Sequence, residues 1–87
     1  MPIKQIDQLT ALFEDTGAAH HEAFKDVNGE DPEWPLWYAE YMQVRLNEIL
    51  EEPLTVSEIV YRLVGLSLRQ GDEAPDEPWA MYYARNF

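Results

Sequence analysis

The sequence predicts a small all-α domain of four helices, built of two helix-loop-helix hairpins. Apolar residues recur three, four or seven positions apart along most of the chain, which is helical spacing. Turn and capping residues interrupt this pattern at three places, namely residues 28–35, 51–55 and 71–78. No alternating run of apolar and polar residues bounded by turn residues competes as a strand.

The first predicted helix covers residues 3–27. Its apolar seam runs through Ile3, Ile6, Leu9, Phe13, Thr16, His20, Phe24 and Val27. Asn28-Gly29 follows, a pair that suits the left-handed residue at which helices end. The small residues Gly17, Ala18 and Ala19 should let another helix approach closely. We expect a large aromatic side chain from residues 34–41 to fill that space.

The second predicted helix runs to about Glu51, where Pro53 stops it. Asp31-Pro32 offers an N-cap followed by a proline in the first turn, while Pro35 favours a start a few residues later. Glu51 and Glu52 lie at the negative end of the helix dipole, so this end should fray. The first half is apolar around most of its circumference, which favours the central helix of a bundle.

The third predicted helix begins at Thr55-Val-Ser-Glu58, which fits a capping box, and ends at Gln70-Gly71. Its apolar residues are Ile59, Val60, Leu63, Val64, Leu66 and Leu68. Gly65 costs about 1 kcal/mol relative to Ala, so we expect a close helix crossing there. Glu58 precedes Arg62 by one helical turn, which predicts a surface ion pair.

The last helix is short, and Asp76-Glu77-Pro78 should cap it after a loop at residues 71–75. Its start echoes that of the second helix: DPEWPLWYAEYM (31–42) aligns with DEPWAMYYARNF (76–87). Trp34 then falls on Trp79 and Tyr38 on Tyr83. We interpret both segments as one helix-start unit whose aromatics dock inward; duplication and convergence both remain open.

Composition limits the function. Seventeen acidic residues against six basic ones give a net charge of -11, which opposes binding of nucleic acid and of anionic membranes. Without cysteine there is no disulfide or thiolate chemistry. The N-terminus lacks the apolar stretch of a signal peptide, and no segment approaches the roughly 18 apolar residues of a membrane span. We therefore expect one domain over residues 1–87, located in the cytoplasm.

His20 and His21 are the first candidates for a binding site. Neighbouring residues on a helix point about 100° apart, and no strong ligand lies three or four positions from either histidine, so no metal is assigned. One hypothesis is a small-ligand pocket, or a metal site completed from elsewhere, formed by His20, His21, Trp34, Trp37, Tyr38 and Tyr41. The alternative is a core or rim histidine beside Trp34 or Trp37, hydrogen-bonded to a tyrosine or a carboxylate, with the aromatics as core.

No catalytic signature and no Gly-rich phosphate loop is present, so the sequence favours a protein that is not an enzyme, and no cofactor is predicted. We expect a protein-interaction or accessory module that binds a protein partner or forms a homodimer. Trp79, Tyr82 and Tyr83, near the end of the chain, are the aromatics expected to be exposed for that partner. The ligand- or metal-binding domain built around His20 is the alternative, and an acidic mimic of nucleic acid is a third.

Three segments, AHHEAF (19–24), DPEWPLWYAEYM (31–42) and LTVSEIVYRL (54–63), resemble a group of small acidic bacterial proteins that share a DPxWPLWYAxY run. The resemblance covers most of the chain. It implies a free-standing bacterial protein and carries over no activity, ligand or site residue.

Overall fold

Residues 3–87 form four α-helices and one 3₁₀ turn in the computed structural model, and this part of the chain contains no strand. The helices are α1 (Ile3–Ala23), α2 (Trp34–Leu50), α3 (Val56–Glu73) and α4 (Trp79–Asn86), with the 3₁₀ turn at Lys25–Val27. The predicted fold class is therefore confirmed. Residues 1 and 2 of the expected domain, and the side chain of Ile3, lie outside the described residues.

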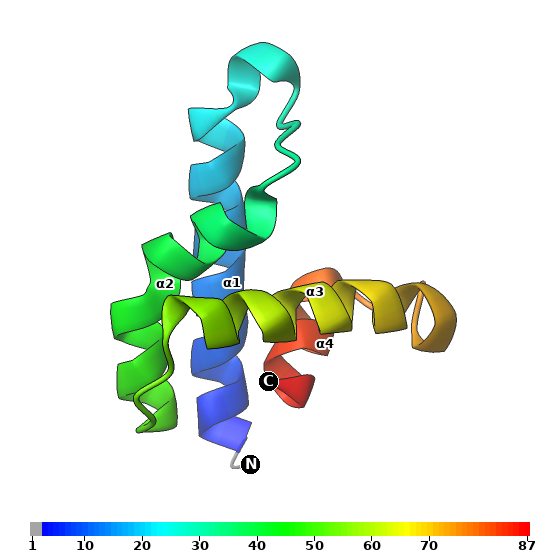
Figure 1. Cartoon of the computed structure of the whole chain (residues 1–87). Coiled ribbons are helices and arrows are strands. Elements are labelled where there is room, and N and C mark those ends of the chain that lie inside the picture. The colour runs from blue at the N-terminus through cyan, green and yellow to red at the C-terminus, as the bar shows by residue number, and fades with distance from the viewer. Residues whose placement is uncertain (1–2) are drawn as a thin grey trace.

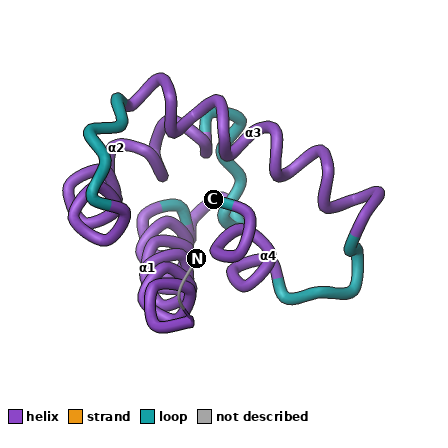
Figure 2. The backbone as a smooth tube through the Cα atoms, turned by 90° about the horizontal axis from the view of Figure 1, so that it is seen from below, coloured by secondary structure: helices purple, strands orange, loops and turns teal. Residues whose placement is uncertain are grey.

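The helices pack as a layer of three with a fourth across it. α1 contacts both α2 and α4, and it lies between them in Figure 2. α3 runs across the direction of α1, packs mainly against α2 and makes a smaller contact with α4 (Figure 1). The first predicted hairpin, α1–α2, is thus closely packed, whereas the second, α3–α4, is more open.

The connection between α1 and α2 is longer than the sequence predicts. α1 ends at Ala23, and Asn28 and Gly29 both adopt the left-handed conformation, as expected for a helix stop. Asp31 does not cap α2: the N-cap is Glu33, and Pro35 occupies the first turn. The expectation that Pro35 delays the helix start is confirmed.

The ends of α2, α3 and α4 differ in how their polar groups are satisfied. Glu51 ends α2 in the left-handed conformation (φ 57°). Beyond it, the side chain of Asn47 exchanges hydrogen bonds with the backbone of Leu54. Thr55 and Glu58 form the predicted capping box at α3. The N-cap of α4 is Pro78, the last residue of the predicted cap segment at residues 76–78.

The core draws side chains from all four helices. Its fully buried members are Leu9, Leu12, Phe13, Ala39, Met42, Leu46, Ile59, Leu63, Leu66, Tyr82 and Ala84. The seam predicted for α1 holds from Leu9 to His20, but Val27 is exposed because the helix ends before it. The helix α2 buries Ala39, Met42 and Leu46, while its aromatics lie at the rim of the core. The expected aromatic interior is therefore formed by Phe13, Tyr82 and Tyr83 rather than by α2.

None of the helices between Ile3 and Phe87 combines the length and the apolar character needed to cross a bilayer.

Candidate functional site

His20 lies buried in a cluster of aromatic rings between the end of α1 and the start of α2. Its ring stacks on Phe24, with centroids 4.7 Å apart, and meets the edge of Trp37 at 5.1 Å. Its Nε2 lies 3.1 Å from Oδ2 of Asp31. A carboxylate only accepts hydrogen bonds, so Nε2 carries the hydrogen. The predicted histidine beside Trp37, bonded to a carboxylate, is therefore what the structure shows.

The bond between His20 and Asp31 has a structural role. The other oxygen of Asp31 accepts the backbone N–H of Glu33, at 3.0 Å. Asp31 thus joins α1 to the first residues before α2, and the two side chains are about nine-tenths buried. A buried polar pair of this kind is costly to break, because removing one partner leaves the other without its hydrogen bond.

The remaining aromatics of the hypothesised pocket pack mainly against one another. Trp37 stacks on Tyr41 at 5.2 Å, and Trp34 meets Tyr38 edge-on at 5.3 Å. The hydroxyl of Tyr41 donates to Asp15 on α1, which raises the pKa of that tyrosine. Trp34, Trp37 and Tyr38 are half-buried and Tyr41 is exposed. Trp37 and Tyr41 line one shallow open hollow and Trp34 and Tyr38 line another, and His20 lines neither.

His21 does not join the His20 cluster. Its side chain is exposed and lies next to the backbone of Gly29. Among residues 3–87, no group of three or more histidine, aspartate or glutamate side chains could hold a metal ion.

The expected partner surface on α4 is mostly interior. Tyr82 and Tyr83 are only 1% and 6% exposed, so the prediction that they are exposed is wrong, whereas Trp79 is 38% exposed. Tyr82 donates a 2.6 Å hydrogen bond to Glu73, and Tyr83 packs edge-on against Phe13. The short α4 is held to α1 and α3 by these aromatics, which explains their burial.

The repeated segments meet in space. Trp79 packs edge-on against Tyr83 as Trp34 does against Tyr38, and Tyr38 also contacts Trp79. The ring of Trp79, rather than an aromatic from residues 34–41 alone, covers Gly17, where an added Cβ would lie 2.8 Å from a ring carbon. The close approach predicted at Gly17 is correct, but its main occupant comes from α4.

The outer face of α3 carries an apolar stripe that no part of residues 3–87 covers. Tyr61 is 82% exposed, Leu68 is 72% exposed and Val64 is also exposed. These residues follow the spacing i, i+3, i+7, so they share one side of the helix. The buried residues Ile59, Leu63 and Leu66 lie on the opposite side. We call Tyr61, Val64, Gly65 and Leu68 the outer stripe.

Gly65 leaves a gap within the outer stripe. A Cβ added to Gly65 would meet nothing within 4 Å, so the close helix crossing predicted there is wrong for the described chain. Val64 and Leu68 belong to the apolar pattern of this helix but are exposed, because no described helix packs on this side of α3. A glycine inside a helix normally costs stability, and here no contact within the described chain offsets that cost.

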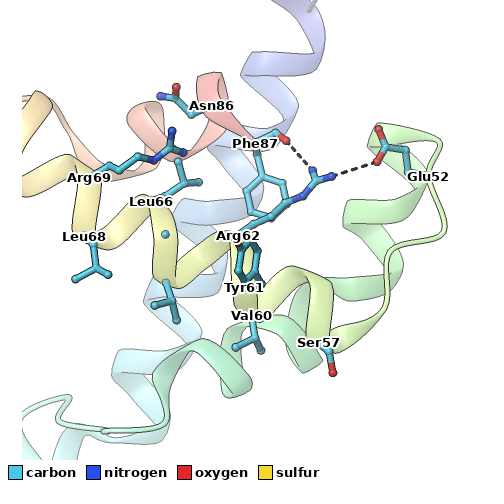
Figure 3. A pocket seen from close by; sticks show the side chains of 12 residues that line it. Glu52, Ser57, Val60, Tyr61, Arg62, Leu66, Leu68, Arg69, Asn86 and Phe87 are labelled. Atoms are coloured by element: carbon cyan, nitrogen blue, oxygen red, sulfur yellow. Dashed lines mark hydrogen bonds and ion pairs between the residues drawn. The ribbon is translucent and has the colours of Figure 1, made fainter.

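An open groove of about 1010 Å³ runs along α3 beside the last residues of α4 (Figure 3). Its walls include Tyr61, Leu68, Arg69 and Phe87. Arg62 lies across it, with its guanidinium 5.4 Å from the ring centre of Phe87. Arg62 donates to the main-chain oxygen of Phe87 at 2.8 Å and lies 3.7 Å from Glu52.

Some of the charged residues beside the outer stripe already have a hydrogen-bond or ion-pair partner within residues 3–87, and others do not. Arg62 is bound to Phe87 and Glu52 rather than to Glu58, which corrects the predicted ion pair. Glu58 accepts the backbone N–H of Thr55, and this hydrogen bond holds the pKa of Glu58 below its usual value. Arg69 forms no ion pair within residues 3–87. An acidic group near the start of α3 and a cation near its end thus flank the stripe.

Comparison of the chain with protein-family models, with curated proteins and with solved structures finds no match.

Sequence reasoning singled out none of the residues of the outer stripe as a site. The available signal was an excess of apolar residues in α3: the sets 59, 63, 66 and 61, 64, 68 each complete one helical face. A single helix in a small domain buries only one such face, so two complete faces indicate that one of them is exposed.

Proposed function

We propose that this protein is a non-enzymatic interaction module that binds another protein helix along the outer stripe of α3. The observation that carries the proposal is the exposure of Tyr61 and Leu68 around the uncovered Gly65. Large apolar side chains on a helix with a polar rim are typical of protein-binding surfaces, and the gap at Gly65 would admit a side chain of the bound helix.

The His20 cluster supports this choice by being satisfied internally. His20 has its hydrogen bond to Asp31, and its ring is packed between Phe24, Trp37 and Tyr38. The outer stripe, in contrast, leaves apolar area in water that a partner would remove. Burial of such area is worth roughly 25 cal/mol per Å² before the costs of association.

A photo-crosslinking amino acid placed at position 61 or 68 tests the proposal in cells that produce the protein. We expect a discrete crosslinked species at both positions, because a helix bound along the stripe contacts both. Val44 on α2 provides the matched control, since it is an apolar residue that is 70% exposed on another helix. Absence of crosslinks at 61 and 68, or the same products from position 44, would contradict the proposal.

A further inference from the structure

We propose that the occupant of the outer stripe is the α3 helix of a second copy of this chain, packed antiparallel to the first. This inference rests on the interaction function proposed above and names its partner. Two features of α3 support it: the apolar stripe is self-complementary in shape, and its charges are self-complementary in an antiparallel pair only.

The spacing of the outer stripe makes it self-complementary in shape. In an antiparallel pair centred near Val64, Tyr61 reaches the level of residues 66–67 of the second copy, between its Gly65 and its Leu68. Each copy then fills the gap of the other with a tyrosine ring, since a two-fold axis makes every contact occur twice. The open space around Gly65 provides the room for this ring.

Glu58 and Arg69 are exposed charged residues at opposite ends of the stripe. They are separated by about three helical turns, so they lie on the same side of the stripe. In an antiparallel pair that side meets itself, which places Glu58 beside Arg69 of the second copy, twice per dimer. A parallel pair would instead place Glu58 and Arg69 opposite the side that carries Val60 and Ser67, and no ion pair would form.

A different acidic helix is disfavoured as the partner. It would satisfy Arg69 but would bring like charge to the carboxylate of Glu58, whereas a second copy brings its own Arg69 there. Two copies also repel at long range, and salt near 0.15 M screens that repulsion beyond about 8 Å while leaving contacts within the interface less affected. Because a single helix pair is a small interface, we expect a dissociation constant on the order of micromolar or weaker.

Sedimentation velocity of the purified full chain, from about 1 μM to about 1 mM at 0.15 M salt, tests the inference. We expect a monomer–dimer equilibrium. The Arg69→Glu variant places Glu58 beside a second acid at two sites, and should weaken the dimer about tenfold or more. The Glu58→Lys variant places a second cation beside Arg69 and should do the same. Circular dichroism checks that both variants are folded.

An equimolar mixture of the two variants is the decisive test of the charge pairing. A mixed dimer keeps the native pair of Glu58 and Arg69 at one site. At the other site the lysine introduced by one substitution meets the glutamate introduced by the other, so opposite charges meet at both. We expect the equimolar mixture to recover dimers that neither variant forms alone. Val44→Asp, on α2, is the control that should leave the dimer unchanged.

The outcomes separate this inference from the proposed function. A wild-type chain that stays monomeric at every concentration overturns the second copy as partner. If positions 61 and 68 still crosslink to a different protein in cells, the interaction function stands without it. A dimer that both charge variants leave unchanged uses another face, and that result also overturns the inference.

Discussion

At the scale of single residues, Gly17 and Gly65 occupy helix interiors for opposite reasons. At Gly17 the ring of Trp79 takes the place of a side chain, and the hydroxyl of Tyr38 lies close by. At Gly65 the same volume is empty. The intrinsic gain on replacing either glycine by alanine is about 1 kcal/mol, so the difference between the two positions reports packing alone.

We expect Gly17→Ala to lower the free energy of unfolding by about 1 kcal/mol, because the cost of displacing the rigid Trp79 ring exceeds the gain in helix propensity. Gly65→Ala should raise it by up to about 1 kcal/mol. Urea unfolding of dilute protein, followed by far-UV circular dichroism, measures both. Equal effects in the two variants would contradict the packing assigned to Gly17.

At the scale of the helices, local signals could be predicted from the sequence and distant contacts could not. Asn28-Gly29 and the Thr55–Glu58 box were predictable because each acts within a few residues of itself. Asp31 resembles an N-cap in sequence, yet its carboxylate is held by His20 and the N–H of Glu33. Which groups bind the Asp31 carboxylate depends on how α1 and α2 pack against each other. The sequence pattern does not show that packing.

At the candidate sites, too, local features could be predicted from the sequence and distant contacts could not. The sequence predicted the surroundings of His20, because the seam of α1 fixes which way that residue points. It did not predict the exposure of Val64 and Leu68, because helical spacing marks a face as apolar without saying whether another helix covers it. The placement of α4 decides that question: Tyr82 binds Glu73 at the end of α3 and Tyr83 packs on Phe13 of α1, so α4 does not cover the outer stripe.

The capping box makes the stability of α3 depend on pH. Its hydrogen bond from Thr55 lowers the pKa of Glu58 in the folded state. A depressed pKa contributes stability that is complete above the unfolded-state pKa, about 4.3, and is lost as the pH falls through the folded value. The contribution should therefore be present at neutral pH and should vanish in acid.

We expect Glu58→Gln to be less stable than the wild type at pH 7, and the difference to shrink below about pH 4 as the wild-type carboxylate is protonated. Thermal unfolding at a series of pH values measures it. Glu40→Gln on α2, an exposed position where the described structure shows no side-chain hydrogen bond, is the control and should track the wild type. A difference that stays constant with pH would contradict the role of the Glu58 carboxylate.

At the scale of the whole molecule, α3 divides its apolar residues between the fold and the surface. Leu66 is 1% exposed and belongs to the core, while Leu68, two positions on, is 72% exposed. A chain of this size hides only about three-fifths of its unfolded surface, so an apolar side chain held out of the core contributes little to folding. Its contribution is expected in association instead.

Leu66→Ala should therefore lower the free energy of unfolding of dilute protein by about 2–5 kcal/mol, whereas Leu68→Ala should change it by less than about 0.5 kcal/mol. The order reverses for association: binding to the folded state raises apparent stability by mass action, so the wild-type melting temperature should increase with protein concentration. In Leu68→Ala that increase should be largely lost. Differential scanning calorimetry over a concentration series separates the two effects. Only a side chain that a partner covers can leave the stability of the dilute monomer unchanged and yet determine how the melting temperature rises with protein concentration.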